Sequence, residues 1–137
     1  MFDNCGLDQL TVRGDDRGSL VAIEGLQDVP FQIARIYYIF GTGPGVERGF
    51  HAHKALHQFA VCVSGSCTIV LDNGQERRSV RLDRPDRGLH IGPMIWREML
   101  DFKPSTVLLV LASAKYDEAD YIRNLDEFHA RVRQEHL

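Results

Sequence analysis

Short apolar and β-branched runs, separated by Gly, Pro, Asn and Asp, dominate residues 10–112. Runs of this length and composition are typical of β-strands, and Asn73-Gly74 between two of them is a strong hairpin signal. The predicted strands are Leu20–Glu24, Ile33–Phe40, Gln58–Ser64, Cys67–Leu71, Arg77–Leu82, Gly88–Ile91, Trp96–Phe102 and Ser105–Ala112. Short strands at this spacing predict an all-β sandwich or barrel.

The pattern changes in the last twenty residues. Acidic residues fill Asp117–Asp120, and Leu125, Phe128 and Val132 then follow at helical spacing within Asn124–Gln134. This spacing predicts a short amphipathic helix that packs as a lid on the strands. No repeat or linker interrupts the chain, so residues 1–137 are expected to form one domain. Its barrel would span about 10–113 and its C-terminal segment about 114–137.

Composition narrows the class of protein. The chain is 44% hydrophobic and 26% charged, as soluble globular domains are. A net charge of -3 gives no general attraction to nucleic acid or anionic membrane, so neither is an expected partner. We see no signal peptide and no apolar run near the ~20 residues that span a bilayer. The cysteines are odd in number and lack a C-x-x-C pair, which favours free thiols in a reducing cytoplasm.

The most informative segment runs from Gly45 to Gly65 and contains His51-Ala52-His53. Residues i and i+2 of a strand face the same side, so the two imidazoles project together. A lone histidine would favour an ordinary buried residue. A pair that follows a Gly-rich loop in an all-β chain favours a functional site.

The spacing of Gly45, His51, His53 and Gly65 is similar to the first motif of the cupin superfamily. Gln58 stands where that motif has its metal-binding Glu, and Arg97 stands near a further His ligand of the second motif. Arg stays protonated and cannot ligate, and Gln is a poor substitute for a carboxylate. We therefore expect no metal and no other cofactor, although His57 leaves a third nitrogen ligand open.

Without a metal, two histidines suit general acid–base chemistry, because their ordinary pKa lies near neutrality. Removing a proton next to a ketone gives an enediol, which can be reprotonated at the neighbouring carbon. One imidazole would carry this proton and the other would polarise the carbonyl oxygen. Either histidine can take either role at this point.

Longer strings resemble the sugar nucleotide 3,4-ketoisomerases, which form the WxcM-like family within the cupin superfamily. These strings are Asp16–Leu20, Arg35–Tyr38, Arg48–Lys54, Cys62–Cys67, Ile91–Met99 and Tyr116–Asn124. The pairing of RGFHAHK with GPMIWREM is far more specific than a cupin motif alone. The resemblance implies an all-β cupin, or jelly-roll, barrel with a short C-terminal helix.

The resemblance also implies an activity. The family moves the keto group of dTDP-4-keto-6-deoxyglucose from C4 to C3, toward 3-amino-3,6-dideoxyhexoses of bacterial surface glycans. Its members are metal-free homodimers that exchange an N-terminal strand. The family pattern assigns catalytic roles to His51, His53 and Tyr37.

The expected substrate-binding residues are Arg17, Arg48, Lys54, Gln58, Ser64, Arg97 and Arg123. The pyrophosphate of the ligand needs counter-charges, which Arg and Lys side chains supply. Arg48 and Lys54 flank the two histidines and are the first choice. Trp96 is open between stacking on the ligand and a place in the core.

Other functions remain open alongside the ketoisomerase. A 3,5-epimerase, or a metal-dependent isomerase or dioxygenase, could use the same fold. A non-catalytic cupin that binds a nucleotide sugar is the third candidate, because a fold alone does not fix a function. An epimerase would exchange the C3 and C5 protons with solvent, whereas a sensor would release its sugar unchanged.

Overall fold

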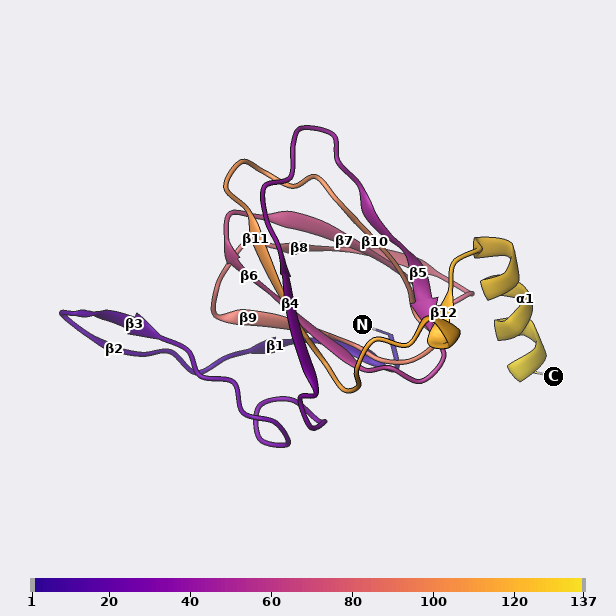
Figure 1. Cartoon of the computed structure of the whole chain (residues 1–137), viewed down its shortest axis with the longest axis horizontal. Helices are drawn as coiled ribbons and strands as arrows, with labels where there is room; N and C mark the ends of the chain where they lie inside the picture. Colours follow the sequence, from indigo (N-terminus) through magenta and orange to yellow (C-terminus); the bar gives the residue numbers. More distant parts are fainter. Residues whose placement is uncertain (1, 137) are drawn as a thin grey trace.

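The computed structural model describes residues 2–136, which fold into two five-stranded antiparallel sheets (Figure 1). The first sheet has the order β1-β9-β6-β11-β4, with β1 (Cys5–Gln9), β9 (Arg87–Ile91), β6 (Gln58–Ser64), β11 (Val107–Ala112) and β4 (Arg35–Ile39). The second has the order β12-β5-β10-β7-β8, with β12 (Tyr121–Ile122), β5 (Arg48–His53), β10 (Trp96–Leu100), β7 (Cys67–Asp72) and β8 (Arg77–Leu82). The predicted all-β class is confirmed, as a jelly-roll sandwich in which no strand of one sheet pairs with a strand of the other within the described residues.

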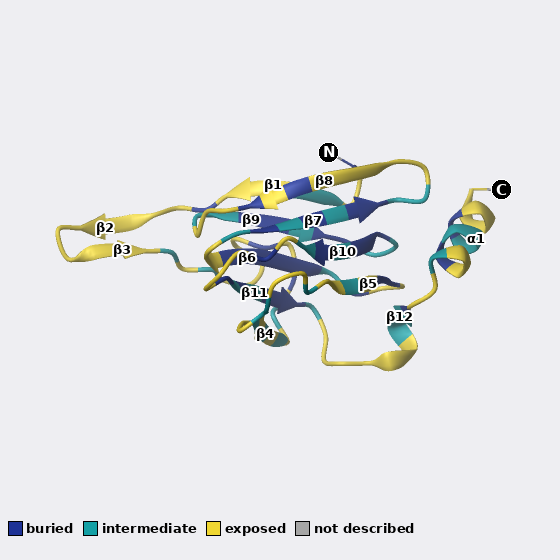
Figure 2. Cartoon of the chain, turned by 90° about the horizontal axis from the view of Figure 1, so that it is seen from above, coloured by how far each residue is buried: buried dark blue, intermediate teal, exposed yellow. Residues whose placement is uncertain are grey.

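The core lies between the two sheets. Its side chains alternate along β7, β9 and β11, as the period of a strand requires. Fully buried members include Ile69, Leu71, Leu89, Ile91, Leu108 and Val110. A second apolar cluster, with Val29, Phe31 and Phe59, covers the outer face of the first sheet. Figure 2 shows the resulting pattern, in which the central strands are buried and the periphery is exposed.

Two predictions about the N-terminal third were wrong. The predicted strand Leu20–Glu24 is absent, and the ladder there is a small hairpin of β2 (Arg13–Asp15) and β3 (Gly18–Leu20). Val21 and Ile23 pack on the outer apolar cluster instead. The sandwich also begins before residue 10, because β1 forms an edge of the first sheet and pairs with β9. The hairpin projects away from the body (Figures 1 and 2).

The C-terminal segment packs on the second sheet. It contains the 3-10 turn η1 (Glu118–Asp120), β12 and the helix α1 (Leu125–Glu135). Asn124 caps the helix by accepting a hydrogen bond from the Glu127 backbone N–H at 2.9 Å. Phe128 packs with Trp96 in an apolar cluster, so Trp96 belongs to the core. The predicted short helix is therefore confirmed. Among residues 2–136, no helix has the length and apolar character to cross a bilayer.

Candidate active site

A β-bulge shapes the strand that carries the two histidines. Against β10, Arg97 pairs with His51 and Glu98 pairs with Gly49, which leaves Phe50 as an extra residue. Gly49 and Phe50 both have left-handed backbone, with φ of 89° and 59°. The bulge changes the alternation of the strand, so that Arg48 and His51 face the same cavity although they are three residues apart.

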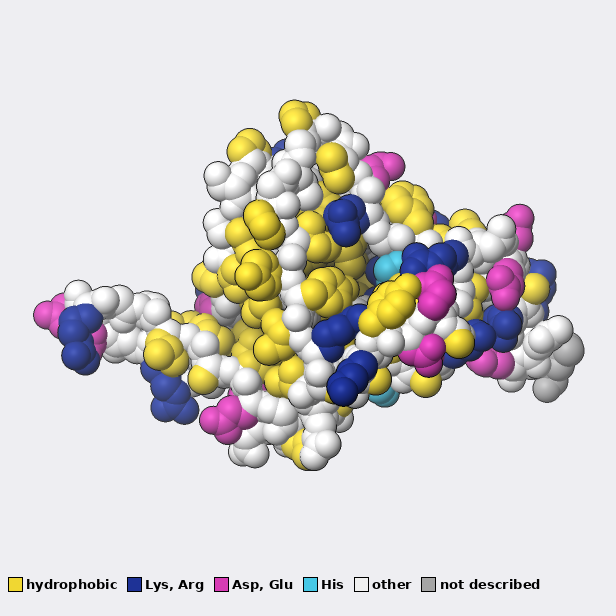
Figure 3. Space-filling model, viewed as in Figure 1, with side chains coloured by type: hydrophobic (Ala, Val, Ile, Leu, Met, Phe, Trp, Pro, Cys, Tyr) yellow, Lys and Arg dark blue, Asp and Glu magenta, His cyan; other side chains and the backbone are white. Residues whose placement is uncertain are grey.

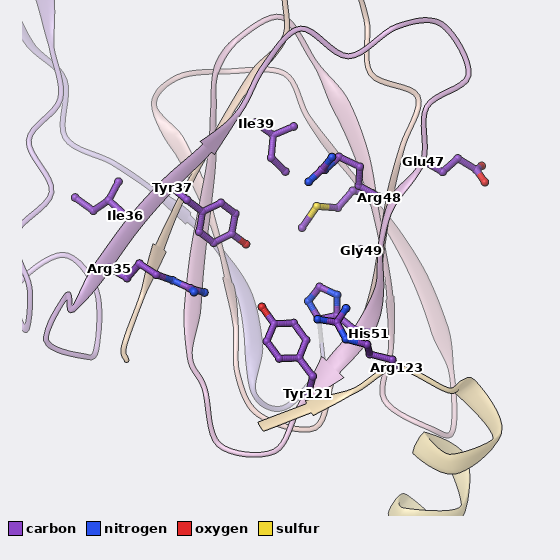
Figure 4. A pocket seen from close by; sticks show the side chains of 11 residues that line it. Arg35, Ile36, Tyr37, Ile39, Glu47, Arg48, Gly49, His51, Tyr121 and Arg123 are labelled. Carbon is purple, nitrogen blue, oxygen red and sulfur yellow. The ribbon is translucent and has the colours of Figure 1, made fainter. Parts of the chain in front are cut away.

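That cavity has a volume of about 500 Å³ and opens between β4 and β5 (Figure 4). It is lined by Arg35, Ile36, Tyr37, Ile39, Glu47, Arg48, Gly49, His51, Met99, Tyr121 and Arg123. Tyr37, Tyr121 and His51 point into it from three different strands (Figure 4). Polar groups that converge in a partly apolar cleft are typical of a binding or catalytic site.

His51, His53 and Tyr121 form a compact group of rings. The ring centroids of the two histidines are 4.9 Å apart, edge to face. Tyr121 lies 4.9 Å from the ring of His51 and 4.3 Å from that of His53. His53 is 1% exposed, and its Nδ1 lies 3.0 Å from Asp120 Oδ2. The prediction that both histidines share one face of the strand is confirmed, with His51 at the cavity and His53 beneath it.

Both histidines are neutral at physiological pH. Burial, and then the positive charge of Arg97, lowers the pKa of His51 and of His53 to about 3. A neutral imidazole has a free lone pair, so each ring is able to accept a proton. This arrangement suits a general base better than a permanently charged donor.

Stability is expected to fall in mild acid. In the unfolded chain both histidines titrate near pH 6.5, whereas in the folded chain they resist protonation down to about pH 3. Between these two pKa values the unfolded state binds more protons than the folded state. The stability that the two neutral histidines contribute is therefore lost as the pH falls from about 6.5 toward 3. We expect the free energy of unfolding to drop by about 2–4 kcal/mol between pH 7 and pH 5, measured by urea titration. His51→Asn should show a smaller drop, and an equal drop in this variant would contradict the assignment.

Tyr37 is held by a buried relay. Arg97 is fully buried and donates from Nη1 to Gln58 Oε1 at 2.5 Å, and from Nη2 to the Ile95 carbonyl at 3.0 Å. Gln58 Nε2 then donates to the Tyr37 hydroxyl at 3.1 Å. Because the hydroxyl oxygen accepts this bond, its proton remains free to be donated into the cavity. Burial raises the pKa of Tyr37, so the hydroxyl keeps that proton.

Positive charge surrounds the mouth of the cavity. Three arginines line it, namely Arg35, Arg48 and Arg123, whereas Glu47 is the one acidic residue among the lining residues described. Arg123 pairs with Glu118 at 2.7 Å, and its guanidinium lies 4.1 Å from the centre of the Tyr121 ring. Figure 3 shows Lys and Arg side chains and a histidine around the hollow on this face. The arrangement favours an anionic ligand such as a phosphate ester.

Several predicted substrate-binding residues lie elsewhere. Gln58 and Arg97 are buried behind Tyr37 and do not line the cavity. Lys54 Nζ donates to the Ala119 carbonyl at 2.9 Å, which braces the turn after β5. Ser64 lies at the far end of β6, roughly 20 Å along the strand from Gln58, and donates to the Ser105 carbonyl. Arg17 lies on the projecting hairpin, paired with Asp15 at 2.6 Å.

Sequence reasoning missed three residues of the site. Arg35 shares a face of β4 with Tyr37, and its position two residues away was a usable signal. The local sequence does not place Tyr121 and Asp120 at the site. They reach it because Tyr121 pairs with His53 across the sheet, a contact between distant parts of the chain. Tyr38, the residue after Tyr37, faces outward and is exposed, as the alternation of side chains along a strand requires.

Within the described residues, no three His, Cys, Asp or Glu side chains converge in a way that could hold a metal ion. His57 in particular lies away from the cavity. Its Nδ1 is 3.1 Å from His90 Nε2, and the two rings are stacked beside Phe31. His57 therefore does not supply the third ligand that its spacing left open, and metal-free chemistry stays a prediction.

Comparison with known proteins decides the family. The profile of the WxcM-like, C-terminal family (FdtA) matches residues 3–133. The chain belongs to this family. A TDP-4-oxo-6-deoxy-α-D-glucose-3,4-oxoisomerase of Aneurinibacillus thermoaerophilus is 50% identical over 123 residues, which cover 90% of this chain and 88% of that relative.

Solved structures of 3,4-ketoisomerases agree with the fold. The H51N mutant of the 3,4-ketoisomerase QdtA from Thermoanaerobacterium thermosaccharolyticum, in complex with TDP-4-keto-6-deoxyglucose, superimposes with a TM-score of 0.96 at 44% identity, over 100% of this chain and 99% of that one. The TDP-quinovose 3,4-ketoisomerase WlaRB from Campylobacter jejuni gives a TM-score of 0.91 at 50% identity, over 94% and 99%. The predicted cupin-type architecture and family are thereby confirmed.

Proposed function

We propose that this WxcM-like chain is an isomerase that moves the keto group of dTDP-4-keto-6-deoxyglucose from C4 to C3. The product is a dTDP-3-keto-6-deoxyhexose. The observation that carries the proposal is one cavity that holds a neutral His51 and a proton-donating Tyr37 behind a rim of arginines. The 50% identical relative is named for this chemistry.

The geometry suggests how the reaction runs. His51 lines the cavity and removes the proton from C3, while electrons move into the C4 carbonyl oxygen. The Tyr37 hydroxyl donates to that oxygen and stabilises the developing charge. The enediol then collapses the other way: the protonated His51 returns its proton to C4, the C4 oxygen keeps the proton from Tyr37, and the C3 hydroxyl releases a proton that replaces the one Tyr37 gave. Because both carbons belong to one ring, one base can serve both steps.

The rim of the cavity suits the pyrophosphate. Arg48, Arg123 and Arg35 come from three different strands or their ends and converge on one opening. Guanidinium groups bind phosphate oxygens through paired hydrogen bonds. With Lys54 and Ser64 placed elsewhere, these arginines are the proposed diphosphate contacts of a single chain.

One experiment tests the function. The purified protein is mixed with dTDP-4-keto-6-deoxyglucose and chelator in deuterated buffer, and the product is followed by NMR. The ketoisomerase predicts a 3-keto product in which deuterium is confined to C4, because C3 then carries the keto group and has no hydrogen. Exchange at C5 would instead indicate a 3,5-epimerase, and bound but unchanged sugar a non-catalytic binding protein. Loss of activity with chelator would point to a metal-dependent enzyme.

We also infer a homodimer with an exchanged N-terminal strand. Ile36 and Tyr38 on the edge strand β4, and Phe40 just after it, are each more than half exposed, as is Leu20 on the projecting hairpin. Apolar side chains gathered in this way are typical of a contact surface. Exchange of the hairpin region would carry Arg17 to a second copy. Sedimentation should give twice the 15.5 kDa chain mass, and a monomer would refute the inference.

We place the reaction in the cytoplasm, on the route to 3-amino-3,6-dideoxy sugars of lipopolysaccharide O-antigens or S-layer glycans. The three cysteines are free thiols, which suits a reducing compartment. A 3-keto sugar is the natural substrate of an amino-group transfer at C3. Fractionation of cells that express the protein tests the location.

A further inference from the structure

Asp120 ends the turn η1 and reaches back to strand β5. Its Oδ2 lies 3.0 Å from His53 Nδ1, and its Oδ1 accepts a hydrogen bond from the Ala55 backbone N–H at 2.9 Å. Its own carbonyl accepts from the Lys54 N–H at 2.9 Å. Asp120 is thus fixed from three sides, and one of its oxygens is directed at a ring nitrogen of the inner histidine.

These contacts determine where the hydrogen of His53 lies. A carboxylate only accepts hydrogen bonds, so the nitrogen that faces Oδ2 must be the donor. In a neutral imidazole the other nitrogen, Nε2, then carries the lone pair. This Nε2 is buried and has no hydrogen-bond partner within residues 2–136. An outer carboxylate that fixes a histidine tautomer in this way is a recurrent device at sites where a ring nitrogen must act.

We propose that Asp120 is a positioning residue for the isomerisation: it holds His53 in the Nδ1–H tautomer, so that Nε2 acts as a proton acceptor. This inference rests on the proposed function and assigns roles within it. An Nε2 without hydrogen cannot donate to the carbonyl oxygen, so that task falls to Tyr37. His53 instead accepts the proton that the C3 hydroxyl loses as the new keto group forms, and this proton then returns to the Tyr37 oxygen, which gave its own to the C4 oxygen.

The substitution Asp120→Asn tests the assignment with little change of shape. The amide has one accepting oxygen and one donating nitrogen. If the oxygen keeps the bond from the Ala55 N–H, the NH₂ group faces His53 Nδ1 and imposes the opposite tautomer. We expect kcat to fall by about 10²–10³-fold, between the effects known for outer-shell partners and for triad aspartates. The KM should change little, since Asp120 does not line the substrate cavity.

The decisive readout is spectroscopic. In ¹⁵N NMR of the free protein, His53 of the wild type should carry its hydrogen on Nδ1, and His53 of Asp120→Asn should carry it on Nε2. A wild-type His53 protonated on Nε2 would overturn the proposal without any variant. So would a D120N protein with the wild-type kcat. The NMR measurement uses no assumption about the sugar, so absence of turnover by the wild type would contradict the proposed function without deciding the tautomer of His53.

A matched control lies on the same turn. Asp117→Asn removes the same charge three residues away, and Asn still caps the turn through the Ala119 N–H. Its kcat and its His53 tautomer should match the wild type. If D117N lost activity as D120N does, the effect would be one of local charge and the proposal would be wrong. Binding of dTDP by each variant checks that the fold is intact.

Discussion

Asparagine in place of His51 lowers kcat of the isomerisation by about 10²–10⁴-fold, the range expected when a general base is removed. The imidazole lines the cavity and is neutral, because burial and Arg97 lower its pKa to about 3. Asparagine fills a similar volume and keeps polar atoms there, but its amide cannot take a proton from carbon. Initial rates with dTDP-4-keto-6-deoxyglucose measure the loss directly.

The nucleotide contacts should survive this change. The proposed diphosphate contacts Arg48 and Arg123 come from other positions on the rim, so the affinity for dTDP is expected to stay within about threefold. His57→Asn provides the control, because His57 stacks on His90 away from the cavity. Its kcat should equal that of the wild type. Comparable losses in H51N and H57N, or near-normal turnover by H51N, would remove the basis of the mechanism.

Local periodicity was sufficient for part of this site. A period of two placed His51 beside His53, and the structure confirms it. The same rule could not place Arg48 with His51, because that requires the bulge at Phe50. Nothing in the residues next to Phe50 marks its left-handed backbone, which depends on pairing with a distant strand.

Contacts between residues far apart in the sequence could not be predicted from the local pattern of hydrophobic and polar residues. Motif spacing singled out Gln58 and Arg97 as substrate-binding residues, but in the structure both are buried behind Tyr37. Arg97 donates a hydrogen bond to Gln58 at 2.5 Å, and Gln58 donates one to the Tyr37 hydroxyl. This supporting role depends on the burial of both side chains, which the motif does not reveal. Asp120 reaches His53 from 67 positions along the chain. Strand propensity is weak in the short segment that carries Asp120, so its docking follows from packing and not from local sequence.

The C-terminal helix therefore matters to the site, and Phe128→Ala should show how much. Phe128 is fully buried and packs with Trp96, Ile122 and Val132 in the apolar cluster under α1. Truncation to Ala leaves a cavity in the apolar contact between α1 and the second sheet. We expect a loss of about 3–5 kcal/mol in the free energy of unfolding, the usual cost of such a change in a core.

The loss should spread from stability to catalysis. Ile122 is in the same cluster and is the neighbour of Tyr121, which faces both histidines. When α1 is loosened, β12 loses its support, and Tyr121 and Asp120 no longer hold their places. We therefore expect a lower kcat and a higher KM in Phe128→Ala, even at temperatures where the variant is folded.

Trp96 gives a local signal for this effect, because it is the single tryptophan and lies 6.0 Å from Phe128, centre to centre. Its fluorescence should report undocking of α1 before global unfolding in a urea titration. Leu125→Ala is the matched control, since Leu125 is only partly buried at the edge of the same cluster and should cost about 1 kcal/mol or less. If Phe128→Ala lost stability yet kept the wild-type kcat and KM, the pocket would be held by β5 alone. The helix would then have no part in the site.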